Sequence, residues 1–368
     1  MKKKIILYGP PVGLNLKKAY GGGSGGYTRN MQVYLDEFVY DDIQIIPLFH
    51  SIDGQFNLSI FTLPFRLLYD FCTIFYNLLK IKPDGIHCLA QYRRAFPREF
   101  MLVFLAFIFR IPVLYEVKAG AFMDAYESGG KLYKRGIDFI IKHSKIILVE
   151  GKVYIHYIQE KFNKNSYYFP NIVKDSEVKN NINEKLQKDS ISILFVGYCY
   201  RGKGVFELVK ACDLAYKQGV NVELTFIGAE HEDFKKYLDD NKFSFNIKRL
   251  GKQNHNVVLQ ELEKNDVYCY LSDHSGEGHN NTINEAMMMG MIIICTPKGF
   301  LENILSNETA YFVRKNIVEE TAQTLLQIKE NRQEALSKSR KARAYLEANF
   351  TSTIAREKLH HYYRELIQ

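Results

Sequence analysis

The sequence predicts an α/β protein of two doubly wound units, each with a mostly parallel sheet covered by helices on both faces. Short apolar runs of strand length alternate with helical stretches along the chain. The alternation stops once, in a polar segment over 170–190, and then restarts. A length of 368 residues suits two domains of ordinary size.

The first half supplies one set of alternating elements. Its strand candidates are apolar along their whole length, which is typical of parallel strands buried on both faces. The expected strands are Ile5–Tyr8, Ile43–Leu48, Gly85–Cys88, Val113–Glu116, Ile146–Val149 and Tyr167–Phe169, and the expected helices are 24–38, 61–80, 97–110, 130–143 and 152–161.

The second half repeats the pattern without a sequence repeat. The expected strands are Ile191–Val196, Val222–Ile227, Val267–Leu271, Met291–Cys295 and Ala310–Val313, and the expected helices are Gly204–Lys217, 231–240, 256–264, 281–289 and 317–329. A helical tail over 332–367 breaks near 349–351, where Thr351 or Ser352 can cap a last helix. We expect one domain over 1–170, joined by the C-terminal helix 351–368, and a second over 171–350. Their strand ends would face a central cleft.

The basic excess is confined to the first half. The formal charge is +8, and residues 1–170 hold 22 basic and 14 acidic side chains, which leaves 27 of each for 171–368. This asymmetry indicates that one half meets an anionic partner, which leaves nucleic acid, a membrane face and a phosphorylated substrate open.

The sequence disfavours a disulfide-bonded, a zinc-binding, a membrane-spanning and a secreted protein. None of the six cysteines forms a C-x-x-C pair, so we interpret them as buried thiols in a reducing cytosol, and no zinc-site spacing occurs. The longest apolar run, Phe100–Phe109, is too short to span a membrane. The lysine-led N-terminus fits a first strand better than a signal peptide.

A glycine-rich loop follows the first predicted strand. Glycines 21, 23 and 26 satisfy G-x-G-x-x-G, but the motif starts eleven residues after the strand and no acidic residue ends the second strand. A dinucleotide site is therefore disfavoured. Gly22, Gly23, Gly25 and Gly26 remain candidates for an acceptor or phosphate loop beside a helix start, against the alternative of a loop without a ligand.

A second loop follows the strand that ends near Gly197. It carries Arg201 and Lys203 before a helix that starts at Gly204. A strand, a glycine turn, cations and a helix N-terminus together favour a diphosphate site, although the loop is not a Walker A motif. The alternative is two exposed cations in a turn.

A third loop precedes the helix at 281–289. Glu277 lies in the loop, Asn280, Asn281 and Thr282 are helix-capping types, and Glu285 lies one turn into the helix. Two carboxylates in one pocket would accept hydrogen bonds from sugar hydroxyls, whereas they would repel a bare phosphate. The alternative for Glu285 alone is an exposed helix charge.

These residues resemble a known family. Glu277-Gly278, Glu285-Ala286-Met287 and Gly290 look like the E-x7-E segment of retaining GT-B glycosyltransferases of the family 4 type, also called glycosyl transferases group 1. The Lys203-Gly204 turn is similar to the family's phosphate-binding turn. Pro170-Asn171 and Lys298-Gly299 also sit where the family has counterparts. The likeness spans the chain in architecture, with the specific motifs in the second half.

The resemblance implies a nucleotide-sugar donor, UDP- or GDP-linked, in the second domain and an acceptor in the first. Glu277 would contact the sugar, Lys203 the diphosphate and Glu285 the ribose. The implied donor-binding set is Gly197, Gly278, His279, Asn280, Asn281, Thr282 and Glu285. The reaction would retain the anomeric configuration and use no metal or other cofactor, and no D-x-D motif occurs.

The sequence departs from the family at two positions. Tyr198 stands where the family usually has an arginine, so we expect Arg201 to join Glu277 and Lys203 as a catalytic residue. The segment after the fourth strand lacks the family's histidine, and Lys118 or backbone amides near Gly120 are the candidates to replace it. Asn280 replaces a proline but keeps the character of a helix start.

Segments 61–71 and 92–100 mix aromatic residues with cations, which suits docking on an anionic leaflet. We therefore expect a cytoplasmic enzyme attached to the inner face of the membrane, with a glycan or lipid-linked acceptor from capsule, O-antigen or exopolysaccharide synthesis. The alternative is ordinary core helices. No sequence motif typical of nucleic-acid binding occurs.

A hydrolase or epimerase of the same fold and a catalytically silent nucleotide-sugar-binding subunit remain alternative functions.

Overall fold

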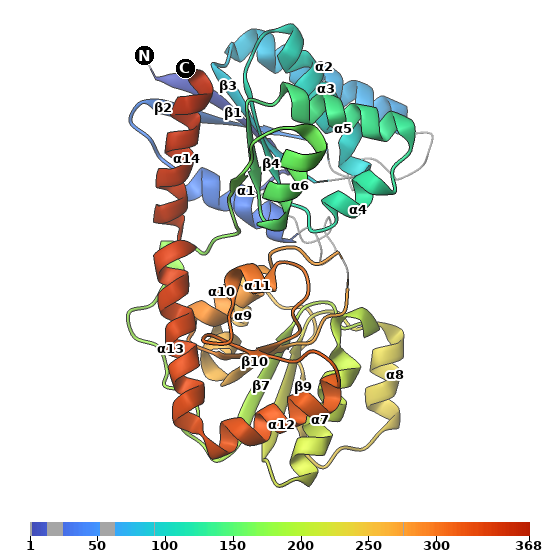
Figure 1. Ribbon diagram of the computed structural model, residues 1–368, viewed down its shortest axis with the longest axis vertical. Coiled ribbons are helices and arrows are strands. Elements are labelled where there is room, and N and C mark those ends of the chain that lie inside the picture. Colours follow the sequence, from blue (N-terminus) through green and yellow to red (C-terminus); the bar gives the residue numbers. More distant parts are fainter. Residues whose placement is uncertain (1, 13–24, 52–62, 92, 275) are drawn as a thin grey trace. The chain divides into compact units, whose positions relative to one another are not determined.

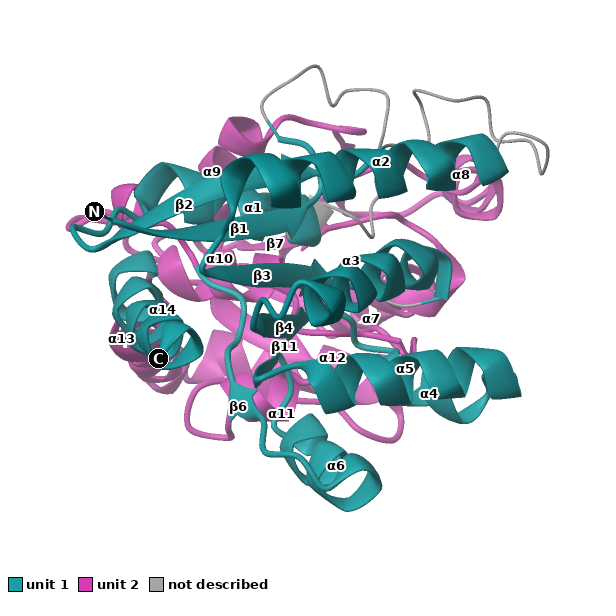
Figure 2. Cartoon of the chain, turned by 90° about the horizontal axis from the view of Figure 1, so that it is seen from above, with its two compact units in different colours: residues 1–172, 352–368 teal, residues 173–351 magenta. Residues whose placement is uncertain are grey.

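The computed structural model describes residues 2–12, 25–51, 63–91, 93–274 and 276–368, and it confirms the α/β class. The chain forms two compact units (Figures 1 and 2). Unit 1 comprises Met1–Ile172 and Ser352–Gln368, and unit 2 comprises Val173–Thr351. Each unit contains a six-stranded parallel sheet flanked by helices. No helix within the described ranges is long and apolar enough to cross a bilayer.

The sheet of unit 1 has the order β2-β1-β3-β4-β5-β6. The strands are β1 Lys3–Gly9, β2 Ile43–Phe49, β3 Gly85–Ala90, β4 Val113–Val117, β5 Ile146–Val149 and β6 Tyr167–Tyr168. The helices are α1 Gly25–Glu37, α2 Leu63–Ile81, α3 Phe96–Ile108, α4 Phe122–Glu127, α5 Lys131–His143, α6 Val153–Phe162 and α14 Ser352–Ile367. The short helix α4 was not predicted, because its six residues are too few to show helical periodicity.

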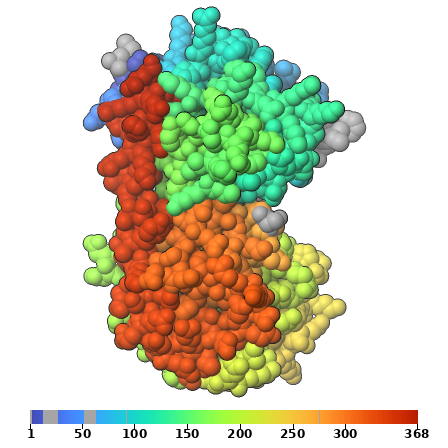
Figure 3. Space-filling model, in the orientation of Figure 1, coloured from blue at the N-terminus to red at the C-terminus, as the bar shows by residue number. Residues whose placement is uncertain are grey.

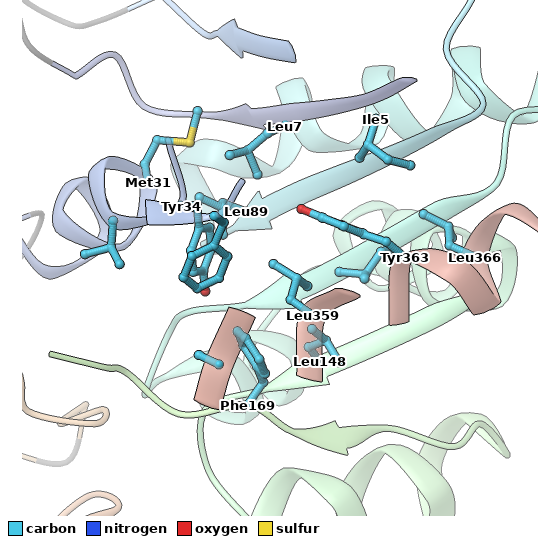
Figure 4. Close-up of a cluster of buried hydrophobic side chains, with 14 of the residues drawn as sticks. Ile5, Leu7, Met31, Tyr34, Leu89, Leu148, Phe169, Leu359, Tyr363 and Leu366 are labelled. Carbon is cyan, nitrogen blue, oxygen red and sulfur yellow. The ribbon is translucent and has the colours of Figure 1, made fainter. Parts of the chain in front are cut away.

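The last helix of the chain, α14, completes the core of unit 1. Leu359, Tyr363 and Leu366 of α14 pack in one cluster with Leu7 of β1 and Leu148 of β5 (Figure 4). In the space-filling view, the dark-red α14 lies beside the green segment that ends at β6 (Figure 3), and the rings of Tyr167 and Tyr362 are 5.2 Å apart. The apolar positions of the tail therefore belong to a core formed mainly by the first half of the chain.

A buried polar network lies within this core. The Glu116 carboxylate of β4 accepts hydrogen bonds from Tyr34 at 2.8 Å and bonds the His87 ring at 2.7 Å. It also pairs with Lys118 at 2.8 Å. The other nitrogen of His87 bonds the Tyr363 hydroxyl at 2.8 Å, so α14 is tied to the sheet by polar as well as apolar contacts.

The sheet of unit 2 has the order β12-β11-β10-β7-β8-β9. The strands are β7 Ile191–Val196, β8 Val222–Ile227, β9 Asn246–Arg249, β10 Val267–Tyr270, β11 Ile292–Cys295 and β12 Tyr311–Phe312. The helices are α7 Val205–Lys217, α8 Glu232–Asp240, α9 His255–Lys264, α10 Asn281–Met288, α11 Leu301–Ile304, α12 Ile317–Glu330 and α13 Arg332–Asn349. Strand β9 was not predicted, because this edge strand is polar and largely exposed.

Two glycines in unit 2 adopt the left-handed conformation in different surroundings. Gly204, at the start of α7, has φ +70°, and a Cβ there would lie 2.1 Å from the carbonyl oxygen of Leu271. Gly219, after α7, has φ +89°, and a Cβ there would meet nothing within 4 Å. Of these two glycines, Gly204 is therefore required by both its backbone angle and its packing, and Gly219 by its backbone angle alone.

We predict that Glu116→Gln destabilises unit 1 by about 3 kcal/mol, because the variant leaves the Lys118 ammonium buried without its counter-charge. Burial alone raises the pKa of Glu116, but the Lys118 charge and the His87 hydrogen bond outweigh it and lower this pKa to about 2. The stabilisation is therefore complete above pH 4.5, the ordinary pKa, and is lost as the pH falls toward 2.

Thermal unfolding followed by circular dichroism between neutral and acidic pH checks this prediction. Glu160→Gln is the control, because Glu160 lies on the exposed surface of α6. A Glu116→Gln protein with wild-type stability at neutral pH would contradict the role given to the network.

We predict that Gly204→Ala destabilises unit 2 by about 3 kcal/mol, because a left-handed alanine and a clash with backbone act together. Gly219→Ala, which has only the backbone cost, is expected to lose about 1 kcal/mol. Denaturant unfolding of the two variants measures the difference. Equal stability of both variants would show that the Leu271 contact is unimportant.

Candidate active site

The loops that follow β7 and β10 contact each other at the carboxyl edge of the unit 2 sheet. These strands are neighbours, so parallel pairing places their following loops side by side. The Ser272 hydroxyl oxygen lies 3.1 Å from the carbonyl oxygen of Gly202, and the backbone N–H of Asp273 donates to the same carbonyl at 3.2 Å. The two polar segments singled out in the sequence therefore form one structure.

Lys203 and Glu277 form an ion pair in this structure. The Lys203 ammonium also donates to the Tyr270 hydroxyl at 2.9 Å, and the Ser272 hydroxyl donates to the Glu277 carboxylate at 2.9 Å. The side chains of Lys203 and Glu277 are 19% and 10% exposed, so the pair is shielded but open to solvent on one side. We call Lys203, Tyr270, Ser272 and Glu277 the ion-pair group.

Tyr270 contributes a neutral hydroxyl to the ion-pair group. Burial and the charge of Glu277 raise the pKa of Tyr270 well above its usual range. The phenol therefore stays protonated, so its oxygen accepts from Lys203 while its O–H donates to the Glu277 carboxylate.

A third loop, after β11, holds the Glu277 backbone in place. Gly299 has φ +63°, and a Cβ there would lie 2.4 Å from the carbonyl oxygen of Glu277. The Thr296 hydroxyl donates to the carbonyl of Ser272 at 2.5 Å. Three adjacent strands, β11, β10 and β7, thus each supply a loop to the site.

Helix α10 begins directly after the Glu277 loop. The Asn280 side chain caps the helix and accepts from the backbone N–H of Thr282 at 2.8 Å. His279 bonds Asn284 at 2.9 Å, and its ring meets the edge of Phe350 at 5.6 Å. Glu285 lies inside α10 and is buried, so it is not an exposed helix charge.

The remaining predicted donor-side residues lie in the same loops. Gly197 follows β7 and donates its N–H to the carbonyl of Ile227 at 2.9 Å. Gly278 follows Glu277, and Asn281 is the first residue of α10. Arg201 is exposed, and its guanidinium stacks 4.5 Å from the centre of the Phe206 ring.

The predicted acceptor-side residues lie in unit 1. Lys118 is buried, and besides Glu116 its ammonium donates to the carbonyls of Phe169 and Pro170 at 3.2 and 3.3 Å. The Gly120 carbonyl accepts from the Tyr154 hydroxyl at 2.8 Å. The structure therefore gives Lys118 a role in holding the end of the first unit together.

The predicted glycine loop is only partly described. Gly25 and Gly26 are the first residues of α1. Gly22 and Gly23 lie outside the described residues. Within the described ranges, no three His, Cys, Asp or Glu side chains gather closely enough to hold a metal ion.

Sequence reasoning missed Tyr270 and Ser272 as parts of the site. Tyr270 was interpreted only as part of an apolar strand, and Ser272 only as the first residue of the loop that precedes the helix at 281–289. Their position at the carboxyl end of a strand was the available signal, because such ends carry ligand sites in parallel sheets.

The geometry of the ion-pair group suits an anionic ligand with hydroxyl groups. An incoming phosphate would compete with Glu277 for the Lys203 ammonium. The Glu277 carboxylate would then be available to accept hydrogen bonds from hydroxyls. The group thus offers one cationic and one anionic binding element next to each other.

Comparison with known proteins shows that the chain is similar to glycosyltransferases. Residues 177–346, nearly all of unit 2, match the family model described as Glycosyl transferases group 1. The chain is 25% identical over 342 residues to an uncharacterized glycosyltransferase, MJ1069, of Methanocaldococcus jannaschii, which covers 88% of this chain and 81% of that protein. It is 24% identical over 191 residues to the capsular polysaccharide biosynthesis glycosyltransferase CapM of Staphylococcus aureus, covering 50% of this chain and 48% of CapM.

The fold also matches solved structures along its full length. Anabaena Alr3699/HepE in complex with UDP superposes with a TM-score of 0.70 at 12% identity, covering 99% of this chain and 100% of that chain. The two-sheet α/β architecture is therefore that of the GT-B glycosyltransferases. Unit 2 is therefore similar to the glycosyl transferases of group 1, and the whole chain shares the GT-B fold.

Proposed function

We propose that the protein transfers a sugar from a UDP- or GDP-sugar to a glycan or lipid-linked acceptor, with retention of the anomeric configuration. The observation that carries the proposal is the Lys203–Glu277 ion pair at the joined loops of β7 and β10. A relative that makes capsular polysaccharide and a similar fold crystallised with UDP-glucose support a role in bacterial surface polysaccharide synthesis.

In this proposal the Lys203 ammonium leaves the Glu277 carboxylate and binds the diphosphate of the donor. Negative charge grows on the diphosphate as the bond to the sugar breaks, so a fixed ammonium stabilises the transition state more than the ground state. Tyr270 and the turn at Gly204 keep the ammonium in position. Because the ammonium is already in position once the donor is bound, little free energy is spent on moving it during the bond-breaking step.

The two carboxylates have separate roles in the proposal. Glu277, released from Lys203, accepts hydrogen bonds from the sugar hydroxyls. Glu285, at the start of α10, accepts from the ribose. Unit 1 supplies the acceptor side. We propose that no metal ion is required and that the protein acts in the cytoplasm, so activity should persist in EDTA.

We predict that Lys203→Ala weakens UDP binding by about 10- to 100-fold, because a charge-assisted contact to phosphate is lost. Lys210→Ala is the matched control, since Lys210 is an exposed lysine of α7, the helix that follows the Lys203 turn. Calorimetry with UDP, GDP and their sugar conjugates measures both variants.

The same screen separates the alternative functions. Release of free sugar without an acceptor would favour a hydrolase, and conversion to another nucleotide-sugar an epimerase. Binding with no turnover on any acceptor would favour a silent subunit. Unchanged UDP affinity of Lys203→Ala would contradict the site assignment.

We predict that Arg201→Ala raises the donor KM and lowers kcat, each by about tenfold, because a second cation near the diphosphate is lost. Arg340→Ala, an exposed arginine on α13, serves as control. Steady-state kinetics with the donor identified by calorimetry measures the effect. Wild-type kinetics for Arg201→Ala would remove Arg201 from the catalytic residues.

A further inference from the structure

Helix α2 of unit 1 exposes most of its apolar residues, although Ile74 and Leu78 are buried, and it buries two of its three charged ones. Its buried positions include Arg66 and Asp70, and Asp70 accepts from the backbone N–H and hydroxyl of Ser51 at 2.9 and 2.8 Å. Its outer side presents Phe65 at 72% exposure and Leu68 at 59%. A helix on the surface of a soluble protein normally shows the opposite arrangement.

The exposed apolar side chains continue from α2 onto α3. Helices α2, α3 and α5 lie side by side on one side of the unit 1 sheet (Figure 2). We call the exposed apolar residues the aromatic face; they are Leu63, Phe65, Leu68, Tyr69, Phe71, Phe75, Tyr76 and Leu79 of α2 and Phe104, Phe107 and Ile108 of α3.

Ring contacts link these helices into a continuous surface. The ring centres of Phe71 and Phe75 are 6.1 Å apart, and those of Phe75 and Phe109 are 5.8 Å apart. Phe107 contacts Phe139 of α5 at 5.7 Å. The exposed residues are therefore neighbours in space, and such contiguous patches on a protein surface mark sites of interaction.

Among the described residues of α2, α3 and the turns beside these two helices, the exposed charges have one sign. Asp70 and Glu99, the acidic residues of α2 and α3, are both buried. The exposed charges are basic: Lys80 near the end of α2, Lys82 and Arg110 just after the two helices, and Arg93 and Arg94 before α3. The Lys80 ammonium lies 5.5 Å from the centre of the Tyr76 ring.

We propose that the aromatic face docks unit 1 onto an anionic lipid bilayer. Aromatic and aliphatic side chains would enter the boundary between headgroups and acyl chains, while the lysines and arginines meet anionic headgroups. A second copy of the chain is a poorer occupant, because it would bring the same basic residues against themselves.

Docking of this kind goes beyond sugar transfer itself. It would hold the enzyme at the surface where a lipid-linked acceptor lies. Vesicle binding is measured without any sugar donor, so its failure would leave the proposed glycosyl transfer untouched.

The test is flotation of the full chain with vesicles of phosphatidylcholine, alone or mixed with phosphatidylglycerol, at low salt. We expect binding to the anionic vesicles only. Phe65→Ser combined with Leu68→Ser should weaken it at least about tenfold, because two large apolar side chains no longer enter the bilayer. The control is Val39→Ser, since Val39 is 72% exposed in unit 1 and lies outside the aromatic face.

A charge variant makes the test independent of the apolar substitutions. Lys80→Glu combined with Lys82→Glu should also weaken binding about tenfold, and added salt should weaken binding of the wild type. Absence of binding, equal binding to neutral vesicles, or wild-type binding by the double serine variant would overturn the proposal. A dimer in light scattering that the serine variant dissociates would identify a second copy as the occupant and would also overturn it.

Discussion

The ion pair between Lys203 and Glu277 is the interaction on which the candidate site depends. An ion pair between a lysine and a glutamate that are largely shielded from water stabilises a protein little unless the other hydrogen-bonding groups of both side chains also have partners. Here Tyr270 and Ser272 supply those partners. The pair therefore requires loops from two adjacent parallel strands, and Gly204 and Gly299 permit the close backbone approach that brings these loops together.

A second lysine–glutamate pair, in unit 1, shows what distinguishes a site from a structural contact. The side chains of Lys118 and Glu116 are 2% and 0% exposed, against 19% and 10% for Lys203 and Glu277. Lys118 also donates to two backbone carbonyls. The Lys203–Glu277 pair is therefore partly open to solvent, whereas the Lys118–Glu116 pair is enclosed in the core. The same two residue types thus form a partly exposed pair in one unit and a fully buried pair in the other.

The sequence predicted the elements whose pattern is strong. Every long strand and helix appeared as an apolar run or a helical period, and the loops after β7 and β10 were identified from glycines, cations and capping residues. The exceptions were α4 and α11, which are too short for a period, and β9, which is polar because it lies on the edge. The position of α14 in the core of unit 1 was expected, but its hydrogen bond from Tyr363 to His87 depends on side-chain packing across 276 residues. The same limit applies to Tyr270, whose role depends on the direction of its hydroxyl.

The aromatic face shows why apolar periodicity alone does not establish which side of a helix is buried. In α2 the apolar residues recur at helical spacing, which ordinarily indicates the side packed against the core. The structure turns Arg66 and Asp70 inward together with only two apolar residues, Ile74 and Leu78, and Asp70 bonds Ser51. Side chains such as Phe65 remain in water and contribute little to the stability of unit 1, since the hydrophobic effect stabilises only surface that is removed from water. A surface of this kind is a liability for a protein free in solution. Its basic border offers a compensating use, because an anionic bilayer can bury the rings and neutralise the charges at the same time. Five of the basic residues behind the +8 of the first half, Lys80, Lys82, Arg93, Arg94 and Arg110, lie at this border.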